Sequence, residues 1–187
     1  DQDLMAQFDH QGWRIYTRVK PNGPGQWSFM YAVAWFNDRN INDILVGDSH
    51  VHKGEGAAAI HILNATYTWR SLDFELMGIE FKPMLEFPFT LEIFDEENNR
   101  APIFDLNVSA QIRWEQFPWN DYLYTTAASG VGLSFSSRTP NLDKLRHIEK
   151  DHRSKWLIDW PLEVTLAHPE HKNIQLALVI RHQSGGR

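Results

Sequence analysis

The chain alternates between apolar and polar residues over several long stretches, which is the pattern of β-strands with two different faces. The clearest case is Ile103–Trp114, where an apolar row that includes Phe104 and Leu106 occupies the even positions. Polar residues from Asp105 to Arg113 occupy the odd positions. This segment predicts a strand with one apolar and one polar face.

About eight segments of this kind predict an all-β, antiparallel protein. The predicted strands are Trp13–Val19, Trp27–Asn37, Ala57–Trp69, Leu72–Phe87, Ile103–Trp114, Tyr122–Ser136, Trp156–Ala167 and Asn173–Ser184. The fourth changes phase near Gly78, where we expect a β-bulge. Many of the segments are close to the 9–11 residues with which a tilted strand crosses a bilayer.

Two barrel architectures fit this alternation, a membrane barrel with its apolar face outward and a soluble lipocalin-like barrel with its apolar face inward. Tryptophans cluster near the ends of the apolar rows, as at Trp27, Trp35, Trp156 and Trp160, which is typical of membrane interfaces. The opposite face carries charges: Asp105, Arg113, Asp159, Glu163, Glu80 and Lys82. Together these features favour a transmembrane β-barrel, with residues 1–187 as a single domain.

Composition supports this interpretation and excludes others. Aromatic residues make up 13% of the 187 residues, yet the mean hydropathy is −0.45, as expected for a barrel with one polar face. The net charge of −6 argues against a nucleic-acid partner. The chain has no cysteine, which excludes disulfides and thiolate metal sites, and no apolar run approaches the roughly 20 residues of a membrane helix.

The last predicted strand carries a candidate catalytic pair. Its even positions run from Ile174 through Leu178 to His182 and Ser184, so both polar residues continue the apolar, outward row. A histidine can accept the proton of a serine hydroxyl and create a nucleophile for an ester carbonyl. The backbone amide of Gly185 could bind the developing oxyanion. The alternative is a histidine at a strand end followed by a turn serine.

Three stretches resemble the outer-membrane lipid A 3-O-deacylases, the PagL-type acyloxyacyl hydrolase family. They are "GIEFKPMLEF", "YTTAASGVGLSFSS" and "LALVIRHQSGG", and the resemblance covers the chain from about Phe74 to its end. The specific element is the histidine, one residue, then a serine, at His182 and Ser184.

The resemblance implies an eight-stranded barrel in the outer membrane of a Gram-negative bacterium. Its activity would be hydrolysis of the 3-O-linked acyl chain of lipid A, with lipopolysaccharide as the partner and no cofactor. His182 would then be the base and Ser184 the nucleophile.

The chain departs from the family pattern at two points. Gly185 stands where the family has an asparagine that helps to form the oxyanion hole, and the family's orienting glutamate would lie beyond Arg187. Asp105, Asp159 and Glu163 fall on the opposite parity, so the third acid of the triad stays unknown. Either the sequence lacks its closing C-terminal strand, or this relative lacks a complete triad.

The other histidines do not predict a metal site. His50 and His52, and His168 and His171, occupy turn-rich stretches without the spacing of a recognised zinc motif, and His147 and His152 lie in a charged insert. We expect solvated loop histidines. Two alternatives to the deacylase remain: a catalytically silent outer-membrane barrel with a structural or partner-binding role, and a soluble barrel that binds an apolar ligand inside.

Overall fold

The computed structural model describes residues 7–14, 24–37, 59–94, 101–138 and 155–185. These residues form ten strands: β1 (Gln7–Arg14), β2 (Gln26–Asn37), β3 (Ile60–Ser71), β4 (Phe74–Leu76), β5 (Ile79–Phe81), β6 (Met84–Phe94), β7 (Ile103–Trp114), β8 (Tyr124–Ser136), β9 (Trp156–Ala167) and β10 (Leu176–Gly185). The predicted all-β, antiparallel class is confirmed. Among the described residues, no helix is long and apolar enough to cross a membrane.

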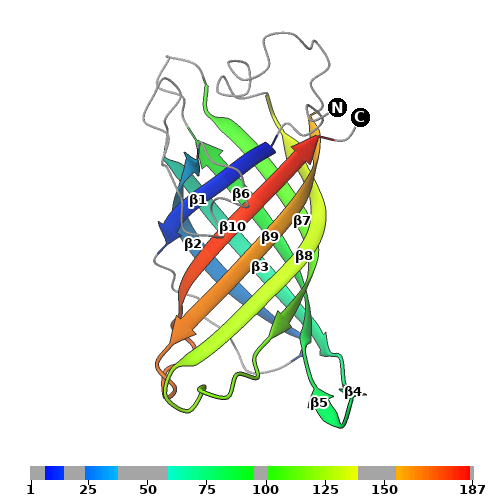
Figure 1. Ribbon diagram of the computed structural model, residues 1–187. Helices are drawn as coiled ribbons and strands as arrows, with labels where there is room; N and C mark the ends of the chain where they lie inside the picture. The colour runs from blue at the N-terminus through cyan, green and yellow to red at the C-terminus, as the bar shows by residue number, and fades with distance from the viewer. Residues whose placement is uncertain (1–6, 15–23, 38–58, 95–100, 139–154, 186–187) are drawn as a thin grey trace.

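Seven strands form one continuous, strongly curled antiparallel sheet in the order β10, β9, β8, β7, β6, β3, β2 (Figure 1). β1 lies between the two edge strands of this sheet. It pairs with β10 at eight positions, from Gln7 opposite Ser184 to Arg14 opposite Ala177, and with β2 at three. The resulting strand order is that of a barrel.

Two predicted strands differ from the observed ones. The first strand, Gln7–Arg14, contains Trp13 and Arg14 of the predicted Trp13–Val19 but begins six residues earlier; residues 15–19 lie outside the described residues. The segment Leu72–Phe87 is not one bulged strand: β4 and β5 form a separate hairpin, and β6 begins at Met84. The hairpin turns at Met77 and Gly78, which have φ of 54° and 78°, as in the tight turns that favour hairpins.

The two faces of the curled sheet have the predicted polarity. On β7, every side chain from Ile103 to Arg113 at an odd position is buried, and every one at an even position from Phe104 to Ile112 is exposed. The exposed, outward residues of the prediction are Phe104, Leu106, Val108, Ile112, Trp156, Ile158 and Leu178, with Leu162 half-buried. Glu80 and Lys82 do not belong to the inner face; they form an exposed ion pair of 2.8 Å at the hairpin, and Glu80 raises the pKa of Lys82.

The interior is filled mainly by polar side chains. The buried Arg113 guanidinium donates to Glu86 at 2.9 Å, Glu163 at 2.6 Å and Thr126 at 2.7 Å, so that it links four strands. This arrangement satisfies the buried charges by pairing, which is the condition for keeping them inside.

A second buried cation ties together more distant strands. Arg181 on β10 pairs with Glu92 on β6 and lies 3.2 Å from Asp159 on β9. In the strand order, three strands separate β10 from β6 in either direction. The pair therefore crosses the interior from one wall to the opposite one.

A smaller apolar cluster completes the interior. Its buried members are Ala32, Ala34, Ile60, Ile62, Phe94, Ile103, Ala177 and Val179. At β8, Gly130 and Gly132 face the neighbouring β7 so closely that a Cβ at Gly132 would clash with the Val108 carbonyl oxygen and with Ser109. Glycine is required there because the two backbones approach each other.

Candidate functional site

The three predicted site residues lie in the last four positions of β10. His182 is opposite Trp160, Ser184 is opposite Ile158, and Gly185 is opposite Leu157 of the neighbouring β9. The side chain of Ser184 falls outside the described part of the structure. His182 and Ser184 thus lie two residues apart on one strand, as the sequence predicts.

The outward row of β10 changes character along its length. Leu176 and Leu178 are exposed by 49% and 39%, Ile180 is half-buried, and His182 is only 8% exposed. His182 is covered in part by Trp160, whose ring lies edge-on to the imidazole with the centroids 6.3 Å apart. The indole is itself oriented, because its Nε1–H donates to Ser129 Oγ on β8 at 3.1 Å. The ring of His182 is thus packed and not solvated.

An acidic residue that the sequence analysis missed occupies the register position opposite His182, and its side chain falls outside the described part of the structure. Asp9 on β1 is the register partner of His182 and also of Asn37 on β2. Residues directly opposite in an antiparallel pair share a face, with Cβ atoms about 4.5–5.5 Å apart. A row of three polar residues, His182, Asp9 and Asn37, therefore crosses three neighbouring strands. Gln7 extends this polar row beside Ser184.

Ser184, together with His182 and Asp9 of the polar row, has the residue types of a nucleophile, a base and an orienting acid. A serine of an acyl-transfer site is activated by a histidine, which a carboxylate holds in the productive tautomer. Ser184, His182 and Asp9 occupy register positions that bring these three residue types to one end of one face. The amide of Gly185 follows directly after the serine.

Three of the four carboxylates that were predicted on the inner face are there, and Glu80 is the exception. Asp105 and Asp159 are buried, and the Glu163 side chain is 11% exposed. Each of these three side chains points to the inner face of the sheet, whereas His182 belongs to the outward row of β10. Asp159 and Glu163 take part in the interior ion pairs, and the acidic residue at a register position beside His182 is Asp9.

The histidines of the β9–β10 connection lie together. His168 and His171 are both exposed, as predicted, and their ring centroids are 5.6 Å apart. Glu170 joins them, a residue that the sequence analysis passed over. His50, His52, His147 and His152 lie outside the described residues.

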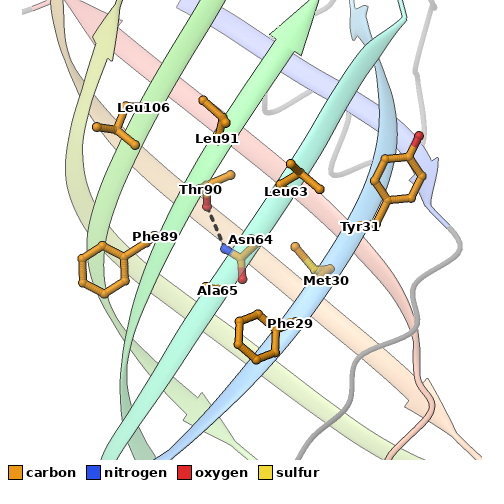
Figure 2. A pocket seen from close by; sticks show the side chains of 10 residues that line it. All are labelled: Phe29, Met30, Tyr31, Leu63, Asn64, Ala65, Phe89, Thr90, Leu91 and Leu106. Atoms are coloured by element: carbon orange, nitrogen blue, oxygen red, sulfur yellow. Dashed lines mark hydrogen bonds between the residues drawn. The ribbon is translucent and has the colours of Figure 1, made fainter.

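An apolar groove of about 530 Å³ marks a different part of the outer wall. It centres on Ala65 of β3, between the larger side chains of Phe29, Leu63, Phe89 and Leu106 (Figure 2). Beneath it, Asn64 Nδ2 donates to Thr90 Oγ1 at 2.7 Å. Its strands, β2, β3, β6 and β7, are different from β9 and β10, so the groove is separate from the His182 site.

Comparisons of the chain with protein-family models, with curated proteins and with solved structures each gave no match.

Proposed function

We propose that this protein is an outer-membrane β-barrel that acts as a serine esterase on the 3-O-linked acyl chain of lipid A. The observation that carries the proposal is the polar row of His182, Asp9 and Asn37, with Ser184 and Gln7 beside it. It interrupts an outer face that is mainly apolar. Polar groups on a lipid-facing surface are costly and are retained for function.

The inverted polarity of the wall supports the membrane part of the proposal. Outward residues such as Leu106 and Leu133 are more than half exposed, whereas Arg113 and Glu86 are almost fully buried. Water does not favour an apolar exterior around a charged interior, but a bilayer does. A lipocalin-like barrel that holds an apolar ligand inside would need the opposite distribution.

Aromatic side chains near both ends of the wall give further support. One group, at the end opposite to His182, contains Trp27 with Tyr67, Trp69 with Phe87, and Phe81 with Trp114. The other contains Phe135 with Trp156, Trp160 with His182, and Tyr31 with His61. Aliphatic residues such as Val108 and Val131 lie between the two groups on the strands. Two aromatic girdles around an apolar band are typical of outer-membrane barrels.

The position of the site along the wall fits a substrate in the outer leaflet. The longest connections, residues 38–59 and 137–155, join strands at the end of the barrel where His182 and Ser184 lie. In outer-membrane barrels the longer loops face the outside. The site would then lie at the level of the lipid A ester bonds.

The proposed chemistry uses three side chains and one amide. His182 takes the proton of Ser184 Oγ as the oxygen attacks the ester carbonyl, and it later returns a proton to the leaving sugar hydroxyl. Asp9 orients the imidazole and stabilises its charged form, and the Gly185 N–H binds the oxyanion. Water then hydrolyses the acyl-enzyme and releases the fatty acid.

Mass spectra of lipid A from cells that express the full chain test this proposal. We expect loss of one hydroxyacyl chain with the unaltered protein and none with Ser184→Ala, because the nucleophile is removed. Ser71→Ala is the matched control: its hydroxyl donates to Asp73 at 2.7 Å at the other end of the wall. Identical spectra for the unaltered protein and Ser184→Ala would contradict the proposal.

The same measurement separates the enzyme from a catalytically silent barrel. The observation that favours a silent barrel is the low exposure of His182, at 8%, beneath Trp160. A silent barrel predicts that all variants leave lipid A intact while the protein still folds into the outer membrane. Retained resistance to denaturation in detergent reports the folded barrel independently of activity.

A further inference from the structure

The connection between β9 and β10 is a compact turn held by its own hydrogen bonds. His171 N donates to the His168 carbonyl at 2.9 Å, and Ile174 N donates to the His171 carbonyl at 3.1 Å. The buried Gln175 anchors the turn from below, since its Nε2 donates to the Lys172 carbonyl at 2.7 Å. These hydrogen bonds fix the backbone of the turn and therefore the positions from which its side chains extend.

Three metal-ligating side chains converge on this turn. His168, Glu170 and His171 each offer one donor atom, and the three atoms lie within 4.8 Å of one another. Ligands on a tetrahedral zinc ion lie about 3.4 Å apart, as follows from Zn–N bonds of about 2.0–2.1 Å. All three side chains are exposed, so small rotations about their side-chain bonds can bring them to that separation.

The charges around the cluster favour a cation. Glu170 supplies a negative charge among two imidazoles. The next basic residue, Lys172, is directed elsewhere: its Nζ lies 4.9 Å from the centre of the Tyr124 ring, in a cation–π contact. The ammonium group of Lys172 therefore has a partner of its own on β8.

One contact must be exchanged when a metal binds. Glu170 N donates to His168 Nδ1 at 3.2 Å, which is long for a hydrogen bond. A metal at Nδ1 replaces this bond; a metal at Nε2 requires the tautomer that carries its proton on Nδ1, and that nitrogen can then no longer accept from Glu170 N. In either case the Glu170 N–H must find another acceptor, so metal binding rearranges this part of the turn.

We propose that His168, Glu170 and His171 form a surface site for a divalent transition-metal ion, with Zn²⁺ as the best-matched ion. Two imidazoles and one carboxylate suit zinc and leave a fourth position for water. Hard cations such as Mg²⁺ prefer oxygen ligands and should not bind. The ion would fasten the hairpin of β9 and β10, the two strands that carry Trp160 and His182.

Titration of the folded full chain with ZnCl₂ in a calorimeter tests the site. We expect the double variant His168→Gln/His171→Gln to bind one zinc ion fewer per protein molecule than the unaltered protein. The single variant Glu170→Gln should bind at least about tenfold more weakly, since even groups that only support a ligand contribute about 10–100-fold. MgCl₂ should give no heat of binding.

His61→Gln provides the matched control. His61 is an exposed histidine on β3, and its Nδ1 lies 2.8 Å from the Tyr31 hydroxyl, on another part of the wall. This variant should bind zinc as the unaltered protein does. An unchanged stoichiometry in the double variant, or an equal loss in His61→Gln, would overturn the proposal. Ser184→Ala should not affect zinc binding, so this test is independent of the proposed esterase.

Discussion

The outer face of β7 and the outer face of β10 begin alike and end differently. On β7 the outward row remains apolar from Phe104 to Ile112. On β10 it starts with Leu176 and Leu178, and ends with His182 and Ser184 beside the polar residues of β1. Both strands therefore have the same alternation, but only one meets a polar row. The comparison shows where the two outer faces differ, and the end of β10 is the part of the wall on which the proposed esterase depends.

The largest expected effect tests the acid of the proposed triad. Asp9→Asn should lower the rate of deacylation about 10⁴-fold, about 5 kcal/mol of transition-state stabilisation, since an amide holds the imidazole in the wrong tautomer. The rate of fatty-acid release from purified lipopolysaccharide is the measurement. Gln11→Asn, two residues along the same β1 row, should keep the full rate. Full activity in Asp9→Asn would remove the polar row from the mechanism.

The next effect tests whether charge belongs inside the wall. Glu86→Ala should lower the free energy of unfolding by about 3 kcal/mol, at the lower end of the range for broken buried pairs, because Arg113 keeps Glu163. Urea unfolding in lipid vesicles measures it. Glu80→Ala, which removes an exposed carboxylate, is the control and should leave the midpoint unchanged. Equal stability of both variants would contradict the buried ion-pair network.

A charge placed on the outer wall compares the two surfaces directly. Val108→Arg, near the middle of β7, should cost about 2–4 kcal/mol of unfolding free energy in vesicles, the range for a cation at mid-bilayer on a lipid-facing strand. Gln11→Arg, in the row near His182, should cost no more than about 1 kcal/mol, as near an interface. If both variants are equally stable in vesicles, the outer face of β7 does not meet lipid.

The smallest expected effect concerns the packing of His182. Trp160→Leu removes the edge-on contact and should lower kcat by about two- to tenfold, matching 0.5–1.5 kcal/mol for such pairs, with KM little changed. Trp156→Leu is the control, because Trp156 packs on Phe135, away from the imidazole. Equal loss of kcat in both would assign the effect to general stability of β9.

The alternation of faces was readable from the sequence because side-chain burial in a strand is set by parity alone. β7 and β9 begin and end where the pattern predicts, and Asp105, Asp159 and Arg113 face inward as expected. The hairpin of β4 and β5 was missed, since a reversal at Met77 and Gly78 and a bulge at Gly78 give the same phase change. Only spatial pairing distinguishes them.

The site was only half predictable for a related reason. His182 and Ser184 are two residues apart, so strand parity alone places them together. Asp9 lies at the other end of the chain, and its position opposite His182 depends on the register between β1 and β10. Nothing local in the sequence specifies that register. Glu170 was missed for a different reason. It is close in sequence to His168 and His171, but the three residues do not have the spacing of a recognised metal motif, and only the turn brings their side chains together.

The ion pair between Arg181 and Glu92 has a consequence for permeation. It spans the interior between opposite walls, and Arg113 fills a further part of the interior with Glu86 and Glu163. Eight strands enclose a space just wide enough for side chains, whereas open aqueous pores need about twice as many. An ion crossing this interior would have to break a desolvated pair on the way. In a planar bilayer the protein should therefore behave as an insulator, with no stepwise increase in current when it inserts.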